Sequence, residues 1–169
     1  MLTDPFAPFL RPNQFVNFDE NTLAVQHAAM LAVGAEADLD KVRAIYTDVI
    51  TSFTYDAVLA ENVQPDYLPD LDEVWRKQSG ICFDYAAVMA AMLRSQGIPA
   101  KLVIGYAGDL YHAWINVFIE DIGWIDNMIY FDGAHWVLMD PTFASGGNAS
   151  AAVMDFIGNE ANYAAKYAY

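Results

Sequence analysis

The stretch CFDYAAVMAAML, residues 82–93, constrains the fold of this chain more than any other segment. Apolar side chains occupy almost every face of a helix drawn through it, and a helix that is apolar all round is buried. Arg94 suits the negative end of the helix dipole, and Gly97 followed by Pro99 ends the helix. The rest of the chain must therefore cover this helix on all sides.

The residues before this helix predict further helices. Residues 22–33 are rich in helix formers, and residues 38–53 place apolar side chains three and four positions apart, as an amphipathic helix does. A short helix is predicted over residues 71–77, with Asp70 as its N-cap. Residues 54–70, which contain two prolines, are interpreted as a loop.

The residues after Pro99 predict strands, because β-branched and aromatic side chains dominate there. The candidate strands are KLVIGY, YHAWINVFIE, GWIDNMIYF and HWVLMDPTF. They follow one another without helices between them, so the sheet should be antiparallel, with a hairpin turn at Asp132-Gly133. The predicted architecture is α+β: N-terminal helices, then a central buried helix that bears the cysteine, packed on an antiparallel sheet. Residues 1–20 are expected to form an extended N-terminal arm and residues 21–169 a single domain.

Composition excludes several classes of protein. The 169 residues are 56% hydrophobic and 18% charged, which argues against disorder. A net charge of -14 makes nucleic acid and anionic membrane surfaces unfavourable partners. No apolar run reaches the roughly 18 residues of a transmembrane helix, so no membrane insertion is expected. The first residues lack the pattern of a signal peptide, but a chain whose leader has been removed would begin in the same way. An extracellular or cell-surface location is the expectation, and the cytoplasm is the alternative.

Three residues could form the core of a cysteine active site. Cys82 is the only cysteine, and it lies in the first turn of the predicted helix, where backbone N–H groups favour a thiolate. His112, near the start of a strand, could accept the thiol proton, and Asp140, before Pro141, could orient the imidazole. Composition and spacing alone leave a second interpretation open, in which the cysteine is a small buried hydrophobe and the histidine is structural.

The ordered motifs GIC, RSQGIP, HAW and DPTF, together with SFTYD and YLPDLDEVWRKQSGIC upstream, resemble the transglutaminase-like superfamily of cysteine enzymes. They are most similar to its bacterial members of the cysteine-peptidase type, and the resemblance covers roughly residues 38–143. It implies a papain-like fold of the transglutaminase-core kind. It also implies a catalytic triad in which Cys82 is the nucleophile, His112 the general base and acid, and Asp140 the orienting carboxylate.

An oxyanion hole would need two donors. The backbone N–H of Cys82, at a helix start, is expected to be one of them. The second should be an upstream side chain, and Gln78, Trp75 and Tyr55 are the candidates. Papain-type enzymes use a glutamine six residues before the cysteine, whereas Gln78 is four before it, and other members of the superfamily use an aromatic donor. Ordinary packing is the alternative role of Trp75 and Tyr55.

Several other residues could contribute to a site. Trp114 follows His112 by two positions, so both face the same side of a strand, and Trp114 is expected to wall the cleft or support the imidazole. His135, next to the predicted hairpin turn, is the alternative catalytic histidine. Three scattered histidines and one cysteine lack metal-ligand spacing, so no metal and no other cofactor is predicted.

The function expected from these residues and from the resemblance is acyl transfer on peptide or amide bonds through a thioester, with a peptide or protein as substrate. Water as acceptor gives hydrolysis, as in a peptidase or deamidase, and a primary amine gives transamidation. Hydrolysis is slightly favoured, because at this length the accessory domains of animal transglutaminases are missing. The alternative is a non-catalytic transglutaminase-like binding module at the cell surface. The sequence leaves the physiological substrate and the oligomeric state open.

Overall fold

The segments predicted to be helical fold as helices. The computed structural model describes residues 4–107, 110–131, 136–138 and 163–169. A 3-10 turn η1 (Ala7–Phe9) precedes α1 (Leu23–Leu31), α2 (Asp38–Ser52), α3 (Ala57–Asn62), α4 (Leu71–Lys77) and α5 (Cys82–Ser95). The predicted N-cap of α4 is confirmed, because the Asp70 carboxylate accepts a hydrogen bond from the Glu73 N–H at 3.0 Å.

The strands form one antiparallel sheet, as the sequence predicts. They are β3 (Ala100–Ala107), β4 (Leu110–Ile119), β5 (Gly123–Phe131), β6 (Trp136–Leu138) and β7 (Tyr163–Ala168), in the order β6-β5-β4-β3-β7. The C-terminal strand β7 was not predicted from the sequence. It pairs with β3, and Tyr169 continues the pairing by exchanging backbone hydrogen bonds of 2.8 and 2.9 Å with Leu102. Pairing with β7 satisfies backbone groups that β3 would otherwise expose at a sheet edge.

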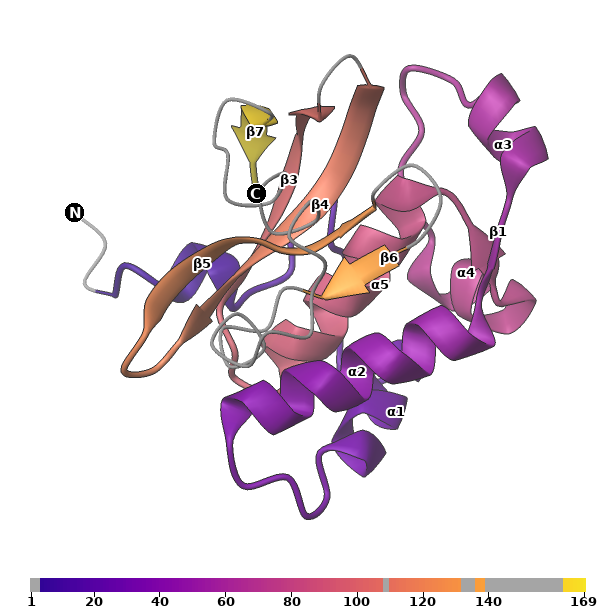
Figure 1. The fold of residues 1–169 in the computed structure, drawn as a ribbon. Coiled ribbons are helices and arrows are strands. Elements are labelled where there is room, and N and C mark those ends of the chain that lie inside the picture. The colour runs from indigo at the N-terminus through magenta and orange to yellow at the C-terminus, as the bar shows by residue number, and fades with distance from the viewer. Residues whose placement is uncertain (1–3, 108–109, 132–135, 139–162) are drawn as a thin grey trace.

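Helix α5 lies at the centre of the fold (Figure 1), between β3 and β4 on one side and α1, α2 and α4 on the other. Residues 86–93 are completely buried, which confirms the prediction from their apolar pattern. Side chains from α1, α2 and α4 and from β3, β4 and β5 join those of α5 in one hydrophobic core. The first turn of α5 therefore has a fixed position relative to the start of β4.

The prediction of a loop over residues 54–70 is wrong for its first half. Strand β1 (Thr54–Tyr55) pairs in parallel with β2 (Ser79–Gly80), and α3 follows directly. The Asp56 carboxylate accepts a hydrogen bond from the Leu59 N–H at 2.8 Å and so caps α3. This cap and the helix-forming residues AVLAEN explain the helix. The remaining segment, between α3 and α4, is a loop.

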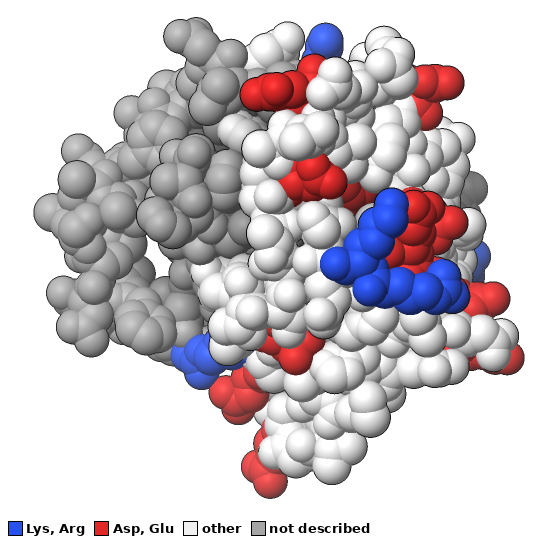
Figure 2. All heavy atoms as spheres, turned by 90° about the vertical axis from the view of Figure 1, so that its right-hand side faces the viewer, with Lys and Arg blue, Asp and Glu red and all other residues white. Residues whose placement is uncertain are grey.

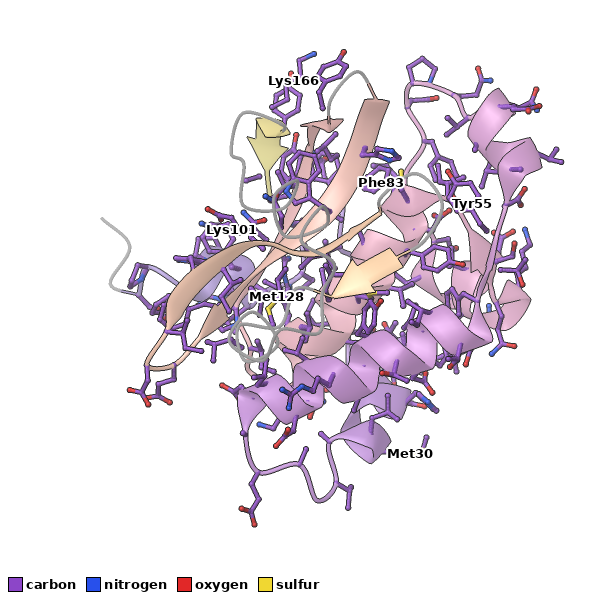
Figure 3. The ribbon with its side chains drawn as sticks, viewed as in Figure 1. Met30, Tyr55, Phe83, Lys101, Met128 and Lys166 are labelled. Carbon is purple, nitrogen blue, oxygen red and sulfur yellow. The ribbon has the colours of Figure 1, made fainter. Side chains whose placement is uncertain are left out.

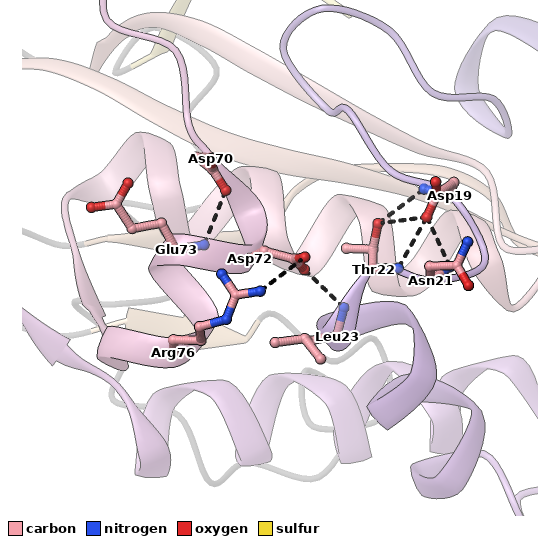
Figure 4. A network of polar contacts seen from close by, with 8 residues as sticks. All are labelled: Asp19, Asn21, Thr22, Leu23, Asp70, Asp72, Glu73 and Arg76. Carbon is pink, nitrogen blue, oxygen red and sulfur yellow. Dashed lines mark hydrogen bonds and ion pairs between the residues drawn. The ribbon is translucent and has the colours of Figure 1, made fainter.

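Polar contacts fix the N-terminal segment to α4 (Figure 4). The Asp72 carboxylate of α4 accepts a hydrogen bond of 2.9 Å from the Leu23 N–H at the start of α1, and it also pairs with Arg76 at 3.5 Å. Just before α1, the Asp19 carboxylate accepts hydrogen bonds from the backbone N–H groups of Asn21 and Thr22. These contacts place the residues before α1 beside the helices that surround α5.

Arg94 connects three segments that are distant in the sequence. Its buried guanidinium donates two hydrogen bonds to the Ala100 carbonyl, of 2.8 and 3.0 Å, and one each to the carbonyls of Arg11 and Tyr169. The guanidinium thus joins the end of α5 to the N-terminal segment and to the residue after β7. The sequence indicated only its favourable place at the end of the helix dipole.

On the face shown in Figure 2, Lys and Arg side chains gather beside acidic ones, and further acidic side chains lie scattered over the same face. Ion pairs on α4 join Arg76 to Asp72 and Lys77 to Glu73. Among the described helices, none combines the length and the apolar composition needed to cross a bilayer.

Candidate active site

The first turn of α5 is tightly packed against the strand that precedes it. Helix α4 ends at Lys77, its C-cap residue Gln78 has a left-handed φ of 49°, and the chain then enters β2. A Cβ atom on Gly80 would lie 2.6 Å from the Cβ of Asp84. Glycine is therefore required here because the side chain of Asp84 folds back from α5 against it. This packing places Cys82 at the start of the helix.

A cavity of about 560 Å³ opens beside this turn, and both Cys82 and His112 line it. The structure thus brings together two of the three residues of the predicted triad. Tyr55 and Phe83 lie at the N-terminal end of α5 (Figure 3) and belong to the cavity wall. Aromatic side chains make up much of that wall, namely Phe15, Tyr55, Tyr67, Phe83, Tyr167 and Tyr169.

The thiol of Cys82 is subject to opposing effects. Burial raises its pKa, and the nearby charge of Asp84 raises it further, while backbone N–H groups of Ala113, Phe83 and Cys82 itself lower it. Burial outweighs the amides, so the pKa lies above its ordinary value. The sequence predicted a thiolate favoured by the helix start. The structure instead gives a thiol that is protonated at rest and needs a base to become a nucleophile.

Strand β4 supplies the backbone amide of Ala113 that contacts the sulfur. Ala113 pairs with Ile104 of β3, whereas the described pairing of β4 with β5 begins only at Ile115. His112 directly precedes Ala113 and lines the same cavity. Burial lowers the pKa of His112, which keeps its imidazole neutral and able to accept a proton near pH 7.

Of the three candidate oxyanion donors, Tyr55 is the one that lines the cavity among the described residues. Its side chain is 37% exposed. Burial raises the pKa of its hydroxyl, and the charges of Cys82 and Asp84 add to this effect. The hydroxyl therefore stays protonated at neutral pH and can donate a hydrogen bond.

The other predicted contributors lie elsewhere. The indole of Trp75 packs against His27 and Phe53, with ring centroids 5.1 and 5.5 Å apart, and Gln78 is exposed at the end of α4. Trp114 is 2% exposed and is not among the described residues that line the cavity, and its expected alternative role, support of the His112 imidazole, stays a prediction.

Asp140 and His135 lie outside the described residues, so the carboxylate of the triad and the alternative histidine remain predictions. Within the described ranges, no group of three or more His, Cys, Asp or Glu side chains is arranged to hold a metal ion.

Two residues near the cysteine, Asp84 and Tyr67, were not predicted from the sequence. Asp84 is 0% exposed, and its carboxylate accepts hydrogen bonds from the Tyr67 hydroxyl at 2.7 Å and from the Ile81 N–H at 2.8 Å. Burial raises the pKa of Asp84, while these two hydrogen bonds lower it. A carboxylate inside an otherwise apolar helix is the signal that could have revealed it, because buried acids need dedicated partners.

Comparison with protein families shows which family this chain belongs to. The family model described as the transglutaminase-like superfamily matches residues 26–141. The chain belongs to the transglutaminase-like superfamily. It is 31% identical over 112 residues to the uncharacterized protein YebA of Bacillus subtilis, which covers 51% of this chain and 14% of YebA. It is 34% identical over 68 residues to a protein-glutamine gamma-glutamyltransferase of Pseudomonas aeruginosa, which covers 32% of this chain and 10% of that enzyme. This transglutaminase-like chain thus spans a small part of the curated relatives that it matches.

Solved structures confirm the predicted papain-like α+β fold of the superfamily. The periplasmic domain of TgpA from Pseudomonas aeruginosa, bound to ethylmercury, matches with a TM-score of 0.56 and 25% identity over 71% of this chain and 46% of that one. A candidate cysteine protease from Cytophaga hutchinsonii matches with a TM-score of 0.56 and 23% identity, over 82% of this chain and 42% of that one.

Proposed function

We propose that this transglutaminase-like chain is a cysteine enzyme that cleaves a peptide or amide bond through a thioester. The thiol of Cys82 attacks the carbonyl carbon and His112 takes its proton. The sulfur–carbon bond forms, the carbon–nitrogen bond breaks, and His112 returns the proton to the departing amine. The observation that carries this proposal is the shared cavity, in which the sulfur meets the Ala113 amide and His112 is the neighbouring residue.

Features of the site support this role. The backbone N–H of Cys82 belongs to the first turn of α5, where N–H groups have no partner within the helix, and the Tyr55 hydroxyl lies on the same cavity. We assign these two groups to the oxyanion that forms on the substrate carbonyl. Among the described lining residues, Asp66 is the one whose side chain is charged at neutral pH. A neutral or cationic peptide segment therefore suits the cavity better than an anionic one.

Asp140 is proposed as the carboxylate that orients His112. Asp140→Asn should then lower turnover by a factor on the order of 10⁴, because the imidazole would be held in the wrong tautomer. Asp126→Asn is the matched control, since the Asp126 carboxylate contacts Asn116 on exposed strand surface. Equal turnover in both variants would remove Asp140 from the proposed mechanism.

Hydrolysis is the favoured outcome of the thioester, and transfer to a primary amine is the second candidate. The second candidate is favoured by the Pseudomonas aeruginosa relative, a protein-glutamine gamma-glutamyltransferase. Both reactions share the acyl-enzyme step. Adding a primary amine such as cadaverine and identifying the products by mass spectrometry would distinguish the two reactions. Hydrolysis predicts the free acid, and transfer predicts the amide.

The pH dependence of Cys82 alkylation tests whether His112 activates the thiol. In the native chain, the iodoacetamide rate should rise as His112 loses its proton, at a pH below the ordinary histidine pKa of 6.5. In His112→Ala, it should rise only as the Cys82 thiol itself loses its proton, above its ordinary pKa of 9.0. His27→Ala is the control, because His27 contacts Asp48 and Trp75 outside the cavity. Identical profiles for the native chain and His112→Ala would refute the enzyme and favour a binding module.

A further inference from the structure

Asp84 is a buried carboxylate that the proposed chemistry does not use. It lies two residues after Cys82, and both of its oxygens are engaged, one by the Ile81 N–H and the other by the Tyr67 hydroxyl. The first contact caps α5, because Ile81 is the N-cap residue and Asp84 the third residue of the helix. The second contact leaves the helix and reaches the loop between α3 and α4.

That loop forms one side of the cavity. Residues 63–68 all line it, and Tyr67 is their contact with Asp84. The ring of Tyr67 also meets the ring of Phe83 edge-on, at 6.4 Å between centroids and 72° between planes. Phe83 stands between Cys82 and Asp84 in the chain, so Tyr67 contacts the first turn of α5 through both its hydroxyl and its ring.

We propose that Asp84 is a positioning residue that holds Tyr67, and with it the wall formed by residues 63–68, against the start of α5. In this position the ring of Tyr67 and the apolar side chains of Val63, Pro65 and Leu68 line the cavity shared with Cys82, and they select an aromatic or apolar group of the acyl donor. The inference rests on the proposed function, since it takes Cys82 as the nucleophile.

Helix capping alone does not account for Asp84. At this third position of the helix, an uncharged amide side chain such as glutamine can also accept a hydrogen bond from the N-cap N–H. The carboxylate instead raises the pKa of the Cys82 thiol, and it requires a glycine at position 80 to make room for it. One carboxylate oxygen serves the cap, and the carboxylate adds a second oxygen that accepts the hydrogen bond from Tyr67.

Two alkylating probes of different size test this role. Iodoacetamide reports the reactivity of Cys82, and N-benzyl iodoacetamide adds an aromatic group that must lie against the wall. In the native chain the aromatic probe should react faster and reach saturation. Tyr67→Phe keeps the ring and loses the bond to Asp84, so the ratio of the two rates should fall about tenfold. Asp84→Asn replaces one of the two charged acceptor oxygens by an amide group, which weakens the contact with Tyr67, so it should lower the ratio in the same direction.

Tyr106→Phe is the matched control. Tyr106 is exposed on β3 near Lys166, outside the cavity, and its loss of a hydroxyl should leave the ratio unchanged. Thermal unfolding of each variant shows that it is folded, and Tyr67→Phe keeps the test decisive should Asp84→Asn unfold. If the native protein reacts faster with the aromatic probe and Tyr67→Phe keeps the same ratio of the two rates, the positioning role is refuted. The proposed function is not affected by that result. A native Cys82 that reacts with both probes no faster than a free thiol refutes the proposed function, and the positioning role with it.

Discussion

Replacing Gly80 by alanine tests the packing that holds the first turn of α5. The added methyl carbon would lie 2.6 Å from the Cβ and 2.7 Å from the Oδ2 of Asp84, closer than carbon and oxygen atoms approach without bonding. Asp84 is completely buried, so its side chain cannot swing into solvent. It must move within the core, away from the Ile81 N–H or from the Tyr67 hydroxyl.

The cost follows from these contacts. A hydrogen bond to a charged group contributes about 1.5–3 kcal/mol, and overpacking a core adds about 1–3 kcal/mol. Losing one hydrogen bond and straining the turn should lower the free energy of unfolding by about 3–4 kcal/mol. For a chain of this length, that corresponds to a fall of about 10 °C in melting temperature.

Urea and thermal unfolding followed by circular dichroism measure this loss. Gly34→Ala is the control, since Gly34 has a φ of +84° and no atom within 4 Å of the added methyl group. A left-handed alanine there should cost about 1–2 kcal/mol through backbone strain alone. If Gly80→Ala destabilises the protein no more than Gly34→Ala does, Asp84 is not packed against Gly80 as described.

Arg94→Lys should lower the free energy of unfolding by about 2–3 kcal/mol, because an ammonium group cannot donate hydrogen bonds to the carbonyls of Arg11, Ala100 and Tyr169 together. An unchanged midpoint in urea unfolding would contradict this. Burial raises the pKa of Asp84, so the folded protein keeps its proton to higher pH than the unfolded chain does. The free energy of unfolding should therefore fall as pH rises from about 4 through that raised pKa. Asp84→Asn should remove this pH dependence. If the stability of the native chain and of Asp84→Asn changes with pH in the same way, the prediction is wrong. Tyr55→Phe should slow acylation of Cys82 by about 10²-fold if its hydroxyl stabilises the oxyanion, and an unchanged rate would leave that donor unassigned.

The sequence predicted those elements whose patterns are long and regular. The amphipathic period of α2, the apolar run of α5 and the β-branched segments of β3, β4 and β5 each identified their own structure. Two short elements were not predicted, one fixed by a local cap and the other by a distant strand. Helix α3 has six residues and depends on its cap at Asp56, and β7 is a strand because β3 offers it an edge.

The site divides in the same way. Cys82 and His112 could be paired in advance because their motifs follow the order of a known superfamily, and the cavity brings them together. Trp75 was considered because it precedes Cys82 closely in the sequence and because some members of the superfamily use an aromatic donor, but its ring packs against His27 and Phe53. Tyr67 lies in a proline-containing loop, and its contact with Asp84, 17 residues later, has no local signature.

The acyl-enzyme itself is the most direct test of the account. After the native chain is treated with p-nitrophenyl acetate, mass spectrometry of the intact protein should show an acetyl group on Cys82 that hydroxylamine removes. The adduct should be absent in Cys82→Ala and should form much more slowly in His112→Ala. A native chain that never acquires the acetyl group, or a Cys82→Ala variant that acquires it equally, would contradict the assignment of this cysteine as the nucleophile.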